Sequence, residues 1–224
     1  MKNRKGDAFW GILLLIWIVV LVVPVLRDAF IKFTEIHPYI GGFIKFFVLA
    51  SMGDMLGARI LFNEWIFPKG FFFKAIVWGI LGIMITLVFT VYIQGTAVAM
   101  EMGRLPFNGS TLALAFFGSS VMNLTFGPMM YVYHKFADLY IDAKYENKGK
   151  ITVKSLVDKV DWYSIVSFSW LKTCLFIWIP LHTLVFLMPS QYRVLASAFL
   201  SILLGVLVAI TKKAKNSEVK IPIN

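Results

Sequence analysis

Six long runs of apolar residues alternate with shorter polar segments along this chain of 224 residues. The runs cover residues 9–26, 39–62, 71–100, 110–133, 163–188 and 194–211. A helix needs about 20 residues to cross the hydrocarbon core of a bilayer, so each run is long enough to span it. The pattern predicts an all-α, polytopic transmembrane helix bundle with six spans, which together form a single integral membrane domain over residues 1–224.

Lysine and arginine gather on alternate connections between these predicted spans. If the amino terminus is cytoplasmic, the connections on the opposite side hold only Arg27, Lys32, Arg104 and Arg193. The basic residues of the cytoplasmic segments are far more numerous: Lys2, Arg4, Lys5, Lys69, six lysines of the loop 135–161, and Lys212, Lys213, Lys215 and Lys220 of the tail 212–224. By the positive-inside rule, both termini are expected in the cytoplasm.

Composition agrees with a membrane protein and narrows its partners. Hydrophobic residues make up 59% of the chain, the formal net charge is +10 and the mean hydropathy is +0.77, values that do not describe a soluble domain. The lysines are expected to contact anionic lipid headgroups at the cytoplasmic face. Nucleic acid is not expected as a partner, and the absence of an Arg- and Ser-rich transit peptide favours a bacterial plasma membrane.

The sequence does not favour an enzyme. The three histidines, His37, His134 and His182, lie on separate segments, and no metalloprotease, nucleophile-elbow or phosphate-loop motif is present. The single cysteine, Cys174, excludes a disulfide framework or a thiolate metal site. No metal and no cofactor is therefore expected.

Two further patterns concern packing. Apolar residues recur at helical spacing over 151–163, which predicts a short helix lying in the cytoplasmic interface or, as an alternative, a solvated connecting helix. Gly53 and Gly57 form a GxxxG face on the second span. Small residues also repeat every four positions in the last span, a stripe that suits another helix or a homo-oligomer: Ser197, Ser201, Gly205 and Ala209.

Ionisable residues inside the spans are the main functional signal, because each costs several kcal/mol unless it finds a partner or water. Asp54 lies well within the second span and is about half a turn from Lys45 on the same helix. Its partner is therefore expected from another span or from bound water. Two interpretations remain open: an interhelical structural contact, or a cation or proton site in a water-filled path.

Helix-breaking residues accompany polar groups in two other spans. The fifth span contains Lys172 and His182 together with Pro180, which removes a backbone donor and is expected to kink the helix. The fourth span contains Asn123, Thr125 and the Gly127-Pro128 pair, which is expected to interrupt it similarly. Interrupted helices with interior polar groups suit a pore or transporter, although bundles that transport nothing also have them.

These motifs resemble the small peroxisomal and mitochondrial inner-membrane channel-like proteins, a family of mostly four-helix membrane proteins with bacterial members. The resemblance rests on three groups of residues: His37-Pro38 with Ser51, Gly53 and Asp54; Gly127-Pro128 with Tyr133, Lys135 and Asp138; and Trp178, His182, Phe186, Pro189, Tyr192, Arg193 and Val194. His182 stands where the family usually has Gln, and the spans 9–26 and 71–100 have no recognised counterpart.

The resemblance implies a pore-forming or solute-permeation role. It would make Asp54 the intramembrane polar group, Gly127 and Pro128 the break in a pore-facing helix, and Arg193 a charge at the external mouth. The same resemblance carries over Asp138, Trp178 and Pro189.

We therefore expect a channel or transporter-like protein for small solutes. Its interior would be lined by Asp54, Asn123, Lys172 and His182, and the breaks at Pro128 and Pro180 would permit gating. The alternative is a membrane scaffold, or a lipid- or partner-binding protein, that transports nothing.

Overall fold

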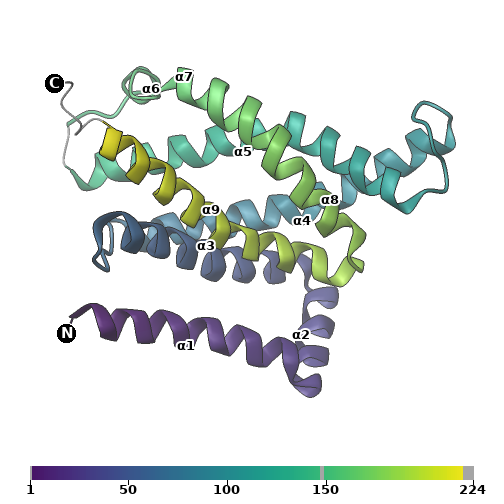
Figure 1. Ribbon diagram of the computed structural model, residues 1–224, viewed down its shortest axis with the longest axis horizontal. Coiled ribbons are helices and arrows are strands. Elements are labelled where there is room, and N and C mark those ends of the chain that lie inside the picture. Colours follow the sequence, from purple (N-terminus) through teal and green to yellow (C-terminus); the bar gives the residue numbers. More distant parts are fainter. Residues whose placement is uncertain (1, 147–148, 219–224) are drawn as a thin grey trace.

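The computed structural model describes residues 2–146 and 149–218, and the described residues form helices joined by short connections (Figure 1). Their order along the chain is α1 (Lys2–Val22), α2 (Pro24–Ile36), α3 (Pro38–Phe62), α4 (Phe71–Glu101), α5 (Thr111–Tyr145), α6 (Val153–Val157), α7 (Trp162–Ser164), the π-helix η1 (Ile165–Trp178), α8 (Ile179–Leu187) and α9 (Ser190–Glu218). No strand occurs among these residues, so the all-α prediction is confirmed.

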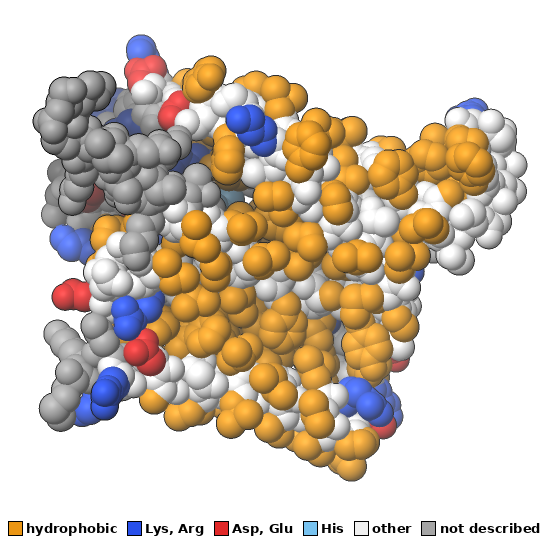
Figure 2. Space-filling view, in the orientation of Figure 1, with side chains coloured by type: hydrophobic (Ala, Val, Ile, Leu, Met, Phe, Trp, Pro, Cys, Tyr) orange, Lys and Arg blue, Asp and Glu red, His pale blue; other side chains and the backbone are white. Residues whose placement is uncertain are grey.

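Six helical segments of the described chain are long and apolar enough to cross a membrane, as predicted. They are Arg4–Val22, Pro38–Phe62, Phe71–Glu101, Thr111–Tyr145, Trp162–Leu187 and Ser190–Leu207. Helix α1 begins and α9 ends at the same end of the bundle, called the near end below, and the opposite end is called the far end (Figure 1). Figure 2 shows hydrophobic side chains over the broad middle of one face, as expected of a surface in contact with lipid.

Helix α3 occupies the centre of the bundle, between α4 and α9. Glycine permits this position, because lipid supplies no hydrophobic drive and close helix packing needs small side chains. A Cβ atom at Gly53 would lie 2.5 Å from the carbonyl oxygen of Ser201, and one at Gly57 would lie 2.8 Å from that of Gly205. On the α4 side, Gly42 approaches Gly82 in the same way, at 2.7 Å from its carbonyl oxygen.

The small stripe of α9 therefore packs within the chain. Its members Ser201 and Gly205 contact the GxxxG face of α3, and Ser197 and Ala209 are buried. The stripe faces α3 and the interior of the bundle. Of the two partners that the sequence leaves open, another helix and a second copy, the packing gives the stripe a helix of the same chain.

Helices α1 and α2 lie along one side of the bundle (Figure 1). Helix α1 meets α3 through polar contacts as well as apolar ones: the indole Nε1 of Trp10 donates to the carbonyl oxygen of Met52 at 3.0 Å. At the near end, Asp7 accepts hydrogen bonds from Arg59 Nε at 3.0 Å and from Trp65 Nε1 at 2.8 Å. These bonds hold a mostly exposed helix in place.

Neither Pro128 nor Pro180 interrupts its helix in the way that the sequence predicts. Pro128 lies inside α5, which continues without interruption from Thr111 to Tyr145. Pro180 lies in the first turn of α8, directly after the π-helix η1, whose 14 residues precede it. Proline clashes with the carbonyl group four residues earlier in an α-helix, and the wider π-helical turn moves that group away. The break at Pro180 is therefore a change of helix type.

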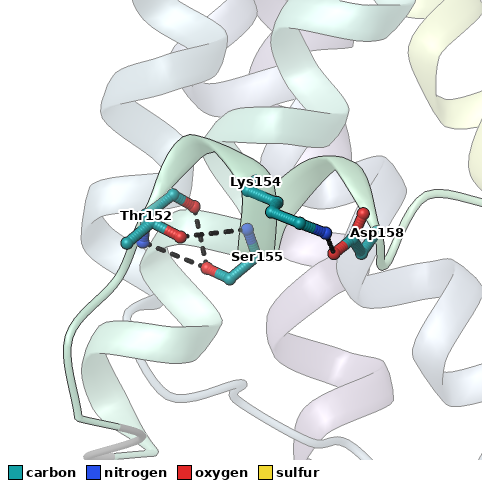
Figure 3. A network of polar contacts seen from close by, with 4 residues as sticks. All are labelled: Thr152, Lys154, Ser155 and Asp158. Carbon is teal, nitrogen blue, oxygen red and sulfur yellow. Dashed lines mark hydrogen bonds and ion pairs between the residues drawn. The ribbon is translucent and has the colours of Figure 1, made fainter.

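The polar connection at the near end is also less regular than predicted. Only Val153–Val157 is helical between residues 149 and 161, so a helix over 151–163 does not form. Figure 3 shows the reason this short helix is stable: Thr152 and Ser155 form a reciprocal capping box, and Lys154 pairs with Asp158 at 2.7 Å. Leu156 is buried, whereas Val153 is 75% exposed.

The glycine contact between α3 and α9 leads to a stability prediction. In Gly205→Ala, the new methyl group would overlap the backbone carbonyl group of Gly53, which cannot move cheaply. We expect a loss of about 1–3 kcal/mol in the free energy of unfolding, measured as a lower Tm of the purified protein in detergent. The matched control is Gly95→Ala in α4, where no atom lies within 4 Å of the added Cβ. Equal Tm values for the two variants would contradict the close packing.

Candidate functional site

A cavity of about 320 Å³, called the central cavity below, lies in the interior between α3, α4, α5, η1, α8 and α9. Much of its wall is aromatic, with Trp78, Phe89, Phe126, Trp170 and Trp178. Two other lining residues, Tyr131 of α5 and Phe168 of η1, are also exposed on the protein surface, at 38% and 41%. They mark the mouth of the cavity, in the half of the bundle toward the near end.

The π-helix explains how one element lines so much of this cavity. The lining residues of η1 and its flanks form groups that recur four or five positions apart: Ser164; Phe168, Ser169 and Trp170; Thr173 and Cys174; Trp178; and His182. In an α-helix, residues five apart are separated by about 140° around the axis. With hydrogen bonds to the fifth residue and about 4.4 residues per turn, the separation falls to about 50°. The wider helix thus keeps Thr173 and Trp178 on one face.

A chain of hydrogen bonds crosses the wall of the central cavity and joins α5, α8 and α9. Ser119 Oγ donates to the carbonyl oxygen of Ile179 at 2.8 Å, and Asn123 Nδ2 donates to the carbonyl oxygen of Ser119 at the same distance. His182 connects the chain to the last helix: its Nδ1 lies 3.1 Å from Asn123 Oδ1 and its Nε2 lies 3.4 Å from Ser197 Oγ. Ser119 and Asn123 are buried.

These bonds define the proton positions on the imidazole. Because Asn123 donates through its amide nitrogen to Ser119, its Oδ1 is the acceptor that faces His182. His182 therefore carries a proton on Nδ1, and its Nε2 accepts from the Ser197 hydroxyl. Trp178 stacks on the imidazole at 5.7 Å between ring centroids, and Phe89 meets it edge-on at 5.9 Å. The result is a neutral polar patch in an otherwise aromatic cavity.

A second cavity, of about 270 Å³ and called the far cavity below, lies toward the far end between α2, α3, α4 and α9. It is more polar than the central cavity, and its charged lining residues are Glu35, Lys45 and Arg193. Phe89 lines both cavities. Its ring packs against Phe186 at 5.0 Å and is 6% exposed. The two cavities thus lie end to end along the bundle, with one aromatic side chain in common.

Charged residues gather at the near end around Trp78, beyond the central cavity. The indole Nε1 of Trp78 donates to Asp54 Oδ2 at 2.8 Å, and its ring stacks on His134 at 4.1 Å. His134 Nδ1 lies 3.8 Å from Asp138 Oδ2, and Lys74 Nζ lies 2.7 Å from Asp142 Oδ1. Asp54 and Lys74 also line a small cavity of about 120 Å³. Trp78 therefore separates the central cavity from an acidic cluster.

The structure brings together some of the predicted site residues and separates others. Asn123 and His182 meet, as described, on the wall of the central cavity. Asp54 has a partner from another span, Trp78, but it does not line that cavity. Lys172 is exposed on η1 and does not line any of the three cavities, so its placement in the interior was wrong. Arg193 lines the far cavity, and its Nε donates to the carbonyl oxygen of Met188 at 2.9 Å.

Sequence reasoning missed Phe89, Trp78 and the role of His134. Phe89 is one of 21 phenylalanines and carries no distinguishing signal in the sequence. His134 was set aside because the three histidines lie on separate segments of the sequence. Lys45 did give a signal, since it is an ionisable residue inside a span, but the sequence could not place it beside a cavity.

Comparisons with known protein families, with curated proteins and with solved structures find no match to this chain.

The hydrogen-bond chain in the central cavity gives a second stability prediction. Asn123→Leu would remove the side-chain acceptor of the His182 Nδ1–H group and thereby the link between α5 and α8, whereas the carbonyl oxygen of Ser119 keeps the backbone N–H of residue 123 within α5. We expect a cost of about 1–3 kcal/mol in the free energy of unfolding, measured as a lower Tm in detergent. The control is Leu124→Ala, at the next position of α5, whose side chain is 53% exposed. If the two variants were equally stable, the chain would not hold the three helices together.

Proposed function

We propose that this protein conducts small solutes across a membrane by way of the far and central cavities, with Phe89 as the gate between them. The observation that carries the proposal is that both cavities are lined by this one side chain. The structure represents the closed arrangement in this proposal, because the ring of Phe89 packs between His182 and Phe186. A rotation of this ring would join the two cavities without any movement of the helices.

The central cavity provides the site at which a solute would pause. Its aromatic walls accept apolar parts of a solute, and the patch formed by Asn123, His182 and Ser197 offers hydrogen bonds. A few convergent polar groups in a mostly apolar cavity are typical of small-molecule sites. His182 is the expected contact for the solute. The hydrogen bond between its Nε2 and Ser197 Oγ is long, at 3.4 Å, so a donor group of the solute can take the place of the Ser197 hydroxyl.

Asp54 has a positioning role in this proposal. Its carboxylate holds the indole of Trp78, which forms the end of the central cavity toward the acidic cluster. The predicted role of Asp54 as a pore-lining group is thus replaced by an indirect one. Trp78 and His134 also link Asp54 to Asp138, a second residue on which the family resemblance rests.

The distribution of Lys and Arg supports one orientation of the protein in the membrane. Most Lys and Arg residues of the connections lie at the near end, so we propose that this end, with both termini, faces the cytoplasm. The far cavity then opens toward the outside, and the mouth at Tyr131 and Phe168 lies on the cytoplasmic side. A bacterial plasma membrane remains the proposed location.

The proposal predicts that the size of residue 89 controls flux. Phe89→Ala should raise the release of small solutes from proteoliposomes about tenfold, the effect of lowering a barrier by about 1.4 kcal/mol. Phe89→Trp should lower it. The readout is the rate of solute release, graded by solute size and charge.

The matched control is Phe116→Ala on α5, whose ring is 48% exposed and lines neither cavity. Similar flux through wild type, Phe89→Ala and Phe116→Ala would remove Phe89 as the gate. No flux through any of these variants, with the protein folded, would move the conclusion to the second candidate function.

That second candidate is a lipid- or partner-binding membrane protein that transports nothing. It is favoured by the aromatic wall of the central cavity and by the position of its mouth, where Tyr131 and Phe168 are exposed among hydrophobic neighbours. A cavity of this kind would hold an apolar molecule that enters from the bilayer.

A further inference from the structure

The far cavity contains a buried ammonium group that no carboxylate of the described residues neutralises. Lys45 is the eighth residue of α3, about 10 Å along the helix from its first residue, and its relative exposure is only 3%. Its Nζ atom lies 5.2 Å from the centroid of the Phe30 ring. Among the described residues, no ion pair involves Lys45, although the side chain lines a cavity of about 270 Å³.

A lysine in this position is costly for folding alone. A charged side chain inside a span costs several kcal/mol unless a partner or water compensates it. The cation–π contact with Phe30 compensates only part of this cost, because such contacts contribute about 0.5–2 kcal/mol. The structural contacts of Lys45 thus do not account for its charge, and the cavity beside it supplies the space for a counter-ion.

The rest of the far cavity favours an anion as that counter-ion. Arg193 provides a second cation, and among the described residues its Nε donates to the carbonyl oxygen of Met188. Glu35 is the single carboxylate of the lining, and it is exposed at the rim on α2. Phe89, Ile93 and Val194 add apolar side chains to the same lining.

We propose that the far cavity binds small water-soluble organic acids, with the ammonium group of Lys45 as the main ligand of their carboxylate and Arg193 as the second. Bound there, the apolar part of the acid lies against Phe89, at the gate. This inference deepens the proposed function and rests on it for the direction of movement, but binding itself does not require transport.

The test is binding to the purified full-length protein in a neutral detergent. The apparent dissociation constant is taken from the rise in Tm with concentration of three probes: sodium propionate, inorganic phosphate and a short-chain phosphatidylglycerol. Lys45→Met, which keeps the length of the side chain and removes its charge, should weaken the binding of propionate at least about 30-fold. Lys45→Arg should retain most of the affinity, and Arg193→Gln should show a smaller loss than Lys45→Met.

The matched control is Lys32→Met, which removes an exposed lysine of α2 outside the cavity. Without ligand, Lys45→Met should be at least as stable as wild type, because it removes a buried charge that has no partner. Unchanged propionate binding in Lys45→Met, or an equal loss in Lys32→Met, would overturn the proposal. Binding of phosphatidylglycerol alone would also overturn it, by assigning Lys45 to a lipid headgroup.

These outcomes are independent of the flux experiment. Propionate binding that depends on Lys45, together with no flux through Phe89→Ala, would leave the anion site standing and reject only the proposed transport. Flux through Phe89→Ala without any binding of propionate would reject only the anion site.

Discussion

The contact between the backbones of α3 and α9 at their glycines is the constraint on which the rest of the structure depends. In a bilayer, helices gain nothing from hiding apolar side chains from lipid, so association relies on close packing and interhelical hydrogen bonds. Gly53, Gly57 and Gly205 bring α9 against one side of α3, and Gly42 and Gly82 bring α4 against another. The π-helix η1 and helix α8 close the remaining side of the bundle, and the central cavity lies between them and α3, α4, α5 and α9.

Polar side chains then determine what that space can do. The hydrogen-bond chain from Ile179 through Ser119, Asn123 and His182 to Ser197 ties three helices together with neutral groups. The formal charges lie on either side of it: Lys45 and Arg193 in the far cavity, and the acidic cluster beyond Trp78 at the near end. Aromatic side chains, Phe89 and Trp78, stand at the two boundaries. The interior is thus divided into compartments of different charge by single residues.

The sequence was sufficient for the six spans, because span length and the distribution of lysines are local properties that hydropathy and counting reveal. The interior was only partly predictable. Asn123 and His182 were recognised because polar groups at membrane depth need partners, and each is the partner of the other. Lys172 looked equivalent in the sequence but is exposed on η1, since hydropathy does not say which face of a helix points inward. The π-helix before Pro180 and the shared side chain of Phe89 depend on packing between distant segments, which no local pattern encodes.

The central claim is that the central cavity is open to water on one side and closed at Phe89 on the other. Cys174, the only cysteine of the chain, is a natural reporter, because it lies on the cavity wall. The measurement is the rate at which a membrane-impermeant thiol reagent modifies Cys174 when it is added to either side of oriented proteoliposomes. In wild type, we predict modification of Cys174 only when the reagent is added to the side on which the termini lie. In Phe89→Ala, we predict modification from both sides. Failure of the reagent to reach Cys174 from either side, in folded wild type and in Phe89→Ala, would contradict the account.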